Sequence, residues 1–188
     1  MEKGYATKPH LADFVLRNLS GAKDSIRMFC YCADYEPGFN LLKARRGAGV
    51  RVRMIFDAEQ FWSSYSSCRR QFSKCREALD ADIEIRTLRP VSAKGASAMH
   101  SKSLIIDASS ALIGSANFTE NGLVHSEEQI CRIDTPAQVG AMVAHWEKAW
   151  SEAKPVTPAE MDAVIERRAT YAGKRKVDSK GAGPTSRS

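Results

Sequence analysis

The chain has 188 residues, 43% of them hydrophobic, which is typical of one globular domain with a full core. Its net charge of +6 lies mostly at one end, because residues 172–188 hold five basic residues and one acidic residue. This distribution excludes a strongly basic folded domain and predicts a basic tail. No apolar run reaches the length of a membrane span, so no stable membrane association is expected.

Helical and strand-like patterns alternate along the first half of the chain. Apolar residues recur at helical spacing in residues 9–19, and alternate with arginines in residues 50–56. Helices are predicted over 9–19, 39–46 and 59–79, and strands over 25–33, 50–56 and 83–88. The alternation predicts an α/β fold in which a mixed, mainly parallel sheet is flanked by helices on both faces.

The second half begins with a loop at 89–98 and ends in a separate helix. Strands are predicted over 99–107, 111–115 and 128–133, a loop over 121–126, and helices over 136–153 and 158–168. Trp146 and Trp150 are expected to pack in the core. Thr157 and Glu160 form a capping box at the start of the last helix. The expected organisation is a main folded domain at 1–154, a C-terminal helix at 155–171 and a disordered basic tail at 172–188.

The five cysteines are odd in number and lack the spacing of a zinc site. We expect reduced, buried cysteines, as in a cytoplasmic protein. The first ten residues hold no apolar stretch typical of a signal peptide. The expected location is the cytoplasm, or the periplasm if a leader has been removed.

The stretch from His100 to Asn117 holds the polar residues that could meet around one phosphate. If a turn pairs Asp107 with Ser110, His100 lies opposite Asn117 and Lys102 lies opposite Ser115. Directly opposed residues share a face, so these four side chains would line one patch. Gly114 would let backbone or ligand approach beside it. A register shifted by one residue would scatter the patch.

The spacing of this stretch is His-x-Lys, four residues, Asp, six residues, Gly-Ser-x-Asn. It resembles the signature of the phospholipase D superfamily at all six specified positions. Neighbouring segments resemble the small single-motif (Nuc-type) endonucleases of that superfamily, over roughly residues 8–153. The resemblance implies a phospholipase D-like fold and cleavage of phosphodiesters.

Phosphodiester cleavage needs either a metal or a nucleophile, a general acid and fixed positive charge. No metal-ligand spacing surrounds the motif, so no metal and no other cofactor is expected. In the metal-free route His100 attacks phosphorus and forms a phosphohistidine. Lys102 and Asn117 would bind the non-bridging oxygens, and Ser115 would orient a neighbour or the phosphate. Asp107 is expected to hold local structure without touching substrate.

The resemblance also points to a glutamate on the following strand that orients His100. Glu128 is preferred, and Glu127 stays open. Members of the superfamily usually supply two motifs, whereas this chain has one. An in-line displacement needs an acid on the far side of phosphorus, so a second His100 is expected from another copy in a homodimer.

Three functions remain open. The first is a nuclease acting on DNA or RNA, and the alternatives are a phospholipase D or phosphatidyl transferase and a non-catalytic nucleic-acid-binding protein. His10, His125 and His145 belong to no pattern. A basic cluster in the predicted helix 59–79 is a solvated face or a phosphate contact, and the aromatic residues beside it are core or base-stacking groups. The basic cluster consists of Arg69, Arg70, Lys74 and Arg76, and the aromatic group of Phe61, Trp62 and Tyr65.

Overall fold

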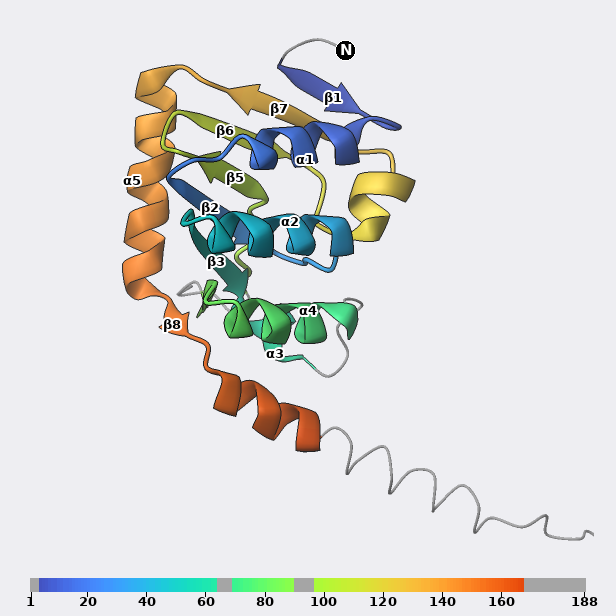
Figure 1. Ribbon diagram of the computed structural model, residues 1–188, viewed down its shortest axis with the longest axis vertical. Helices are drawn as coiled ribbons and strands as arrows, with labels where there is room; N and C mark the ends of the chain where they lie inside the picture. The colour runs from blue at the N-terminus through green and yellow to red at the C-terminus, as the bar shows by residue number, and fades with distance from the viewer. Residues whose placement is uncertain (1–3, 64–68, 90–96, 168–188) are drawn as a thin grey trace, which may run out of the picture. The chain divides into compact units, whose positions relative to one another are not determined.

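The computed structural model describes residues 4–63, 69–89 and 97–167. The chain divides into two compact units, residues 1–156 and 157–188. In the described part of the first unit, eight strands form one sheet in the order β1-β7-β6-β5-β2-β3-β4-β8 (Figure 1). In the second unit, residues 158–167 are helical. The predicted capping box is confirmed there, since Glu160 Oε2 accepts from Thr157 N at 2.9 Å and Thr157 Oγ1 accepts from Glu160 N at 3.2 Å.

The strands of the first unit follow the predicted pattern, apart from two short ones at the edges and from the strand predicted over 99–107. Of that strand only β5 forms, beginning at Ser103, so His100 and Lys102 precede it and are not part of a strand. The strands are β1 Tyr5–Thr7, β2 Ser25–Cys30, β3 Arg51–Asp57, β4 Glu84–Leu88, β5 Ser103–Ile106, β6 Ser110–Gly114, β7 Gln129–Ile133 and β8 Lys154–Pro155. The helices are α1 Leu11–Ser20, α2 Glu36–Gly47, α3 Ala58–Trp62, α4 Arg69–Asp80 and α5 Pro136–Glu152, with a π-helical segment η1 at Asn121–His125. A loop was expected where η1 lies.

The mixed α/β sheet flanked by helices is confirmed, but its parallel part is smaller than expected. Among the described strands, only the neighbours β2-β3 and β3-β4 are parallel. Helical crossovers join these three strands, as parallel neighbours require. The other pairings are antiparallel, and β5 and β6 form a hairpin because only three residues connect them.

One predicted helix is wrong. Residues 59–79 were expected to form a single helix, but α3 ends at Trp62 and α4 begins at Arg69. Ser63 is extended (φ −63°, ψ 134°). Serine side chains compete for backbone hydrogen bonds and so weaken a helix in this serine-rich stretch.

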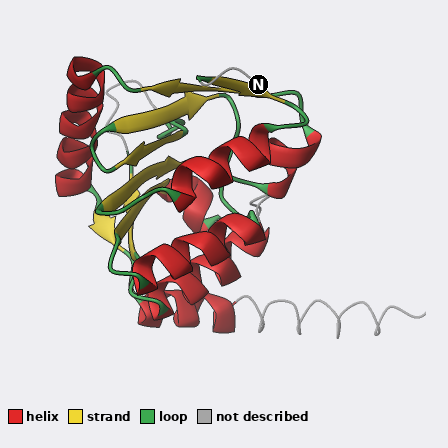
Figure 2. Cartoon of the chain, turned by 45° about the horizontal axis from the view of Figure 1, so that its top comes forward, coloured by secondary structure: helices red, strands yellow, loops and turns green. Residues whose placement is uncertain are grey.

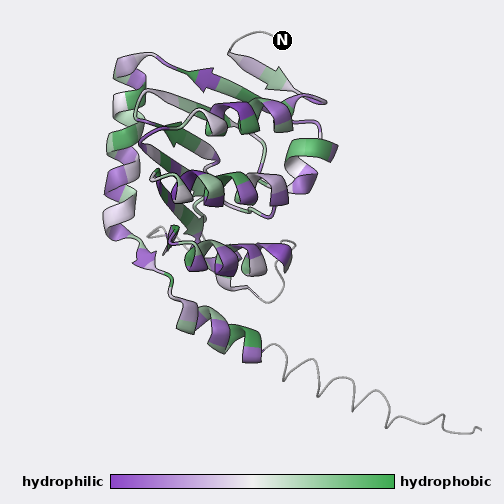
Figure 3. Cartoon of the chain, in the orientation of Figure 1, coloured by the Kyte–Doolittle hydropathy of each residue, from purple (hydrophilic) through white to green (hydrophobic). Residues whose placement is uncertain are grey.

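Helices cover both faces of the sheet. α1, α2 and α4 lie on one face, and α5 crosses the other (Figure 1, Figure 2). Phe29, Ile55 and Ile105 point toward α5 and pack with Trp146 and Trp150. The expected core position of both tryptophans is therefore confirmed. Figure 3 shows hydrophobic residues concentrated on the central strands, while each helix carries both hydrophobic and hydrophilic residues.

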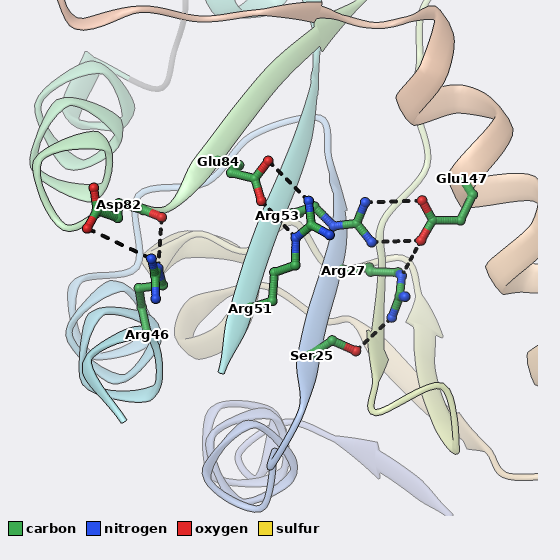
Figure 4. A network of polar contacts seen from close by, with 8 residues as sticks. All are labelled: Ser25, Arg27, Arg46, Arg51, Arg53, Asp82, Glu84 and Glu147. Carbon is green, nitrogen blue, oxygen red and sulfur yellow. Dashed lines mark hydrogen bonds and ion pairs between the residues drawn. The ribbon is translucent and has the colours of Figure 1, made fainter. Parts of the chain in front are cut away.

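A charged network ties α5 to the sheet (Figure 4). Glu147 accepts from Arg53 Nη2 at 2.7 Å and Nη1 at 3.1 Å, and from Arg27 Nε at 2.8 Å. The guanidinium of Arg53 is buried and lies 4.5 Å from the ring centroid of Trp146. Burial on its own raises the pKa of Glu147, but the hydrogen bonds and charges of Arg53 and Arg27 outweigh it, so the pKa is lowered.

We therefore expect Glu147→Gln to lower the free energy of unfolding by about 1–3 kcal/mol at pH 7. A lowered pKa in the folded state gives stability that is present above the unfolded pKa of about 4.3 and is lost as pH falls through the folded pKa. Urea unfolding of both proteins at pH 7 and pH 3 measures this, and the difference should shrink at pH 3. Glu152→Gln on the same helix is the control, because its pair with Lys148 is exposed. Equal losses in the two variants would contradict the prediction.

The expectation of reduced, buried cysteines is wrong at two positions. Cys32 is disulfide-bonded, and Cys131 is free but exposed. Cys32 falls within the strand predicted over 25–33, but β2 ends at Cys30, so Cys32 lies beyond the strand. Cys30 and Cys75 are free and buried as expected, and burial raises the pKa of both thiols. Cys68 lies outside the described residues.

Candidate active site

The β5–β6 hairpin carries the motif, and its register differs from the prediction by one residue. The pairs run from Ser103 opposite Ile113 to Ile106 opposite Ser110. Continuing this register, Lys102 faces Gly114 instead of Ser115, and His100 faces Ala116 instead of Asn117. The prediction that these pairs align four polar side chains on one face is therefore wrong. Asp107 was expected to pair with Ser110, but it lies in the turn with a left-handed φ of 52°, a conformation that aspartate tolerates.

Contacts with a distant segment explain this turn. The Asp107 carboxylate accepts from the backbone N–H groups of Asp24 at 2.8 Å, Ser25 at 2.9 Å and Lys23 at 2.9 Å. Burial raises the pKa of Asp107, but these donors outweigh it, and the pKa is lowered. The carboxylate thus fastens the tip of the hairpin to the start of β2, which is a structural task.

Gly114 lies where β6 approaches β7. A Cβ at this position would lie 2.0 Å from the carbonyl oxygen of Gln129 and 2.9 Å from Cα of Ile130. Backbone therefore occupies the space that the missing side chain leaves. Next to it, Ser115 Oγ accepts from the backbone N–H of Gln129 at 3.2 Å. Gly114 and Ser115 therefore hold the end of β6 close to β7.

His100 and Lys102 are in direct contact. Lys102 Nζ lies 3.2 Å from Nδ1 and 3.3 Å from Nε2 of His100, and donates to the His100 carbonyl oxygen at 2.8 Å. The ring of Tyr31 meets the His100 ring edge-on with centroids 4.5 Å apart. The Lys102 ammonium also lies 5.2 Å from the Tyr31 centroid. The exposed imidazole is thus held between a cation and an aromatic ring.

Burial and a nearby carboxylate act in opposite directions on the pKa of Lys102. Burial lowers its pKa, while the charge of Glu128 acts in the opposite direction, and the net shift is downward. Glu128 is half-buried just before β7, whereas the exposed Glu127 lies 3.7 Å from Lys8. The electrostatic contact with Lys102 favours Glu128 as the carboxylate of the site. Among the described contacts of the His100 ring nitrogens none is with a carboxylate, so the orienting role of Glu128 stays a prediction.

Asn117 lies in the segment after β6, at the same end of the hairpin as His100. Its Oδ1 is buried and has no hydrogen-bond partner among the described residues. Backbone contacts hold the segment, because the carbonyl oxygen of Phe118 accepts from Asp34 N at 3.0 Å and Tyr35 N at 3.2 Å. The hairpin therefore brings Ser115 and Asn117 to the same end as His100 and Lys102. Among the described residues, no hydrogen bond joins the side chain of Asn117 or Ser115 to His100 or Lys102.

Two residues near the site were not singled out from sequence. Tyr31 follows the end of β2 and contacts His100, as described above. Asp57 is buried at the end of β3, where Oδ1 accepts from Gln60 N and Oδ2 accepts from Met99 N, both at 2.8 Å. The carboxylate caps α3 and fixes the residue preceding His100. An aspartate closing an apolar strand directly before a helix is a capping signal that could have revealed it.

Several other candidates lie away from the motif. Lys74 pairs with Glu36 at 3.1 Å, and Arg70 with Asp34 at 3.5 Å, so much of the basic cluster is engaged in ion pairs. Phe61 is 1% exposed, which confirms its core position. His125 is exposed, and no contact described here gives it a role. Tyr65 and the side chain of Arg69 lie outside the described part of the chain.

Two absences complete the description of the residues that the structure describes. No group of three or more histidine, cysteine, aspartate or glutamate side chains there is arranged to hold a metal ion. No helix there combines the length and hydrophobicity needed to cross a membrane.

Solved structures share this fold. Nuc from Salmonella typhimurium, a phospholipase D family member, is 22% identical with a TM-score of 0.70, covering 81% of this chain and 95% of its own. NucT from Helicobacter pylori is 19% identical with a TM-score of 0.70, covering 81% and 97%. Phosphatidylserine synthase from Haemophilus influenzae is 11% identical with a TM-score of 0.63, covering 92% of this chain but 46% of its own. At these identities the likeness shows the fold alone.

No curated protein sequence matches the chain. The sequence profile described as "Cardiolipin synthase, PLD-like domain" matches residues 15–150. This range contains the hairpin, the segment with Asn117, β7 and most of α5, and it covers more than half of the chain. The chain therefore belongs to the phospholipase D-like family, as the motif at His100, Lys102 and Asp107 predicts.

Proposed function

We propose that this protein is a metal-independent nuclease that cleaves phosphodiesters of DNA or RNA through a phosphohistidine on His100. The observation that carries the proposal is the contact of the Lys102 ammonium with the exposed His100 ring. An ammonium at this distance from the ring can bind a phosphate oxygen while the neighbouring ring nitrogen attacks phosphorus. Asn117 adds an amide to the same end of the hairpin, and its N–H₂ group can donate to a second oxygen.

The reaction needs a proton donor for the leaving oxygen, opposite the attacking nitrogen. One imidazole cannot occupy both sides of phosphorus. We infer a homodimer in which the second His100, protonated, is the general acid and later activates water as a base. Light scattering should give the mass of two chains, whereas an active enzyme that is strictly monomeric would reject this arrangement.

Cleavage in excess EDTA tests the central proposal. The purified protein should cut single-stranded and duplex oligonucleotides equally well before and after chelation, because His100 and Lys102 supply the nucleophile and the charge. Loss of activity on chelation, with restoration by a divalent cation, would reject the metal-free mechanism. Absence of cleavage under all conditions would reject the nuclease.

A second function has support in the comparisons. The matching sequence profile carries the description "Cardiolipin synthase, PLD-like domain", and phosphatidylserine synthase shares the fold, so the same chemistry could act on a lipid phosphodiester. The fold comparison favours the nuclease, because the TM-score is 0.70 with Nuc and NucT but 0.63 with the synthase. Release of headgroup from phospholipid vesicles, without cleavage of nucleic acid, would select the lipid function.

The pH dependence tests the role of Glu128. Glu128 raises the pKa of Lys102 against the effect of burial, so Glu128→Gln removes an effect that keeps the ammonium protonated. The alkaline decline of kcat/KM, which reports the free enzyme, should therefore begin at a lower pH in this variant. Glu127→Gln is the matched control, since Glu127 lies beside Lys8, and its profile should equal that of the parent. An unchanged alkaline limb in Glu128→Gln would contradict the assignment.

The disulfide at Cys32 indicates the cellular compartment in which the protein folds. Disulfides persist mainly in oxidising compartments, so this bond favours the periplasmic alternative over the cytoplasm. Counting free thiols in protein isolated from its native host tests this inference.

A further inference from the structure

A groove of about 640 Å³ lies beside the motif, between α5 and strands β5, β6 and β7. This volume falls in the range of small-molecule sites. Lys102 and Ser101 form its wall on the side of the active site, and Phe29 and Ile105 belong to its apolar lining. Because Lys102 also contacts His100, the groove adjoins the place where the scissile phosphate would bind.

The chemistry of the lining combines flat apolar surface with polar edges. His145 of α5 presents an exposed imidazole to the groove, and its ring lies 5.6 Å from that of Phe29 between centroids. Met142 lies beside His145 in the lining, and Gln129 contributes an amide. The hydroxyl of Tyr5 donates to Gln129 Oε1 at 3.1 Å. The Gln129 oxygen is therefore engaged, and the amide nitrogen is the group that can donate to a ligand.

We propose that this groove binds one unpaired nucleobase next to the scissile phosphate, with His145 as a stacking surface. The inference rests on the proposed nuclease function. A nucleobase has two apolar faces for Phe29, Met142 and His145 and polar edges for Gln129 and Ser101. An acyl chain offers no partner for these polar groups, and covering them without hydrogen bonds costs free energy.

A preference for unpaired nucleic acid follows from this site. A base in a duplex is paired and stacked on both faces, so it must leave the helix before it can enter a groove in the protein. The groove adjoins Lys102, so the base would have to unpair at or next to the cleaved bond. Single-stranded substrates avoid this cost, and the protein should cleave them with a lower KM than the same sequence in a duplex.

The experiment fills the groove from α5. Ala141 is exposed and lines the groove, whereas Ala144 is exposed on the same helix and does not line it, so Ala141→Trp has Ala144→Trp as its matched control. The substrate is a fluorescent single-stranded oligonucleotide, compared with the same strand carrying abasic residues at the cleavage position. Binding is measured by fluorescence anisotropy in a His100→Ala background, and KM and kcat are measured in the active protein.

Ala141→Trp should weaken binding of the normal strand and raise its KM about tenfold, with little change for the abasic strand. His145→Ala should act in the same direction, and Ala144→Trp should match the parent. Equal effects on normal and abasic strands would overturn the proposal. If sedimentation showed that Ala141→Trp dissociates a dimer, the groove would hold a second copy of the chain, and the proposal would be wrong. If the variant affected only binding to phospholipid vesicles, the groove would hold a lipid, and the proposal would also be wrong.

The binding readout separates the two proposals. Parent protein that binds the normal strand through the groove but does not cleave it would reject the nuclease function while supporting the base site. Cleavage that proceeds unchanged in Ala141→Trp would support the nuclease and reject the base site.

Discussion

Replacing His100 with alanine is expected to lower kcat on oligonucleotides by about 10⁴- to 10⁶-fold, as is typical when a nucleophile is removed. The fall arises because the variant lacks the ring nitrogen that lies beside the Lys102 ammonium and attacks phosphorus in the proposed route. Stability should change by less than about 0.5 kcal/mol, since the imidazole is exposed. Initial rates in EDTA and thermal unfolding of both proteins give these two quantities.

The control is His125→Ala, which removes another exposed histidine and should leave kcat unchanged. A second measurement addresses the covalent step. In reactions quenched at alkaline pH, mass spectrometry should detect a His100 peptide joined through the phosphate to one fragment of the cleaved oligonucleotide, because displacement of one ester oxygen leaves the other in place. A modified peptide that contains a different residue, or rapid cleavage by His100→Ala, would reject His100 as the nucleophile.

The central strands could be predicted because their signal is local. β2 and β3 contain apolar runs, and β4 alternates buried with more exposed residues, and the prediction places each within a few residues of its observed bounds. β1 and β8 have three and two residues, too few to show a period of two, and only their partners in the sheet define them. The break between α3 and α4 was missed because absence of proline and glycine does not guarantee a continuous helix.

Within the site, residue types were predictable and their register was not. The motif identified His100 and Lys102, and the structure places them in contact. The hairpin register depends on Asp107, whose carboxylate binds backbone 82 to 84 positions away in the chain, and no local pattern records that contact. The same is true of Asp57, which holds Met99 across 42 positions. Long-range hydrogen bonds thus fix the hairpin register and the position of Met99, which sequence spacing does not determine.

Replacing Gly114 with alanine should be the most damaging single-methyl change near the motif. Its Cβ would lie 2.0 Å from the carbonyl oxygen of Gln129, so β6 and β7 must separate. Overpacking against a rigid backbone costs about 1–3 kcal/mol or more, and we expect a loss at the upper end. Ser115 would also lose its contact with the backbone of Gln129, and Asn117 would move with it. We therefore expect kcat/KM to fall about 100-fold even where the variant is folded.

The matched control is Gly140→Ala in α5, where nothing lies within 4 Å of the added methyl group. Alanine favours a helix over glycine by up to about 1 kcal/mol, so this variant should gain stability and keep its activity. Urea unfolding and kcat/KM of both variants, measured well below their unfolding midpoints, separate a local from a global effect. Both changes add one methyl group, so the decisive result is a lower free energy of unfolding for Gly114→Ala and a higher one for Gly140→Ala. If Gly114→Ala were as stable and active as the parent, the close approach of β6 and β7 would not hold Ser115 and Asn117 in place.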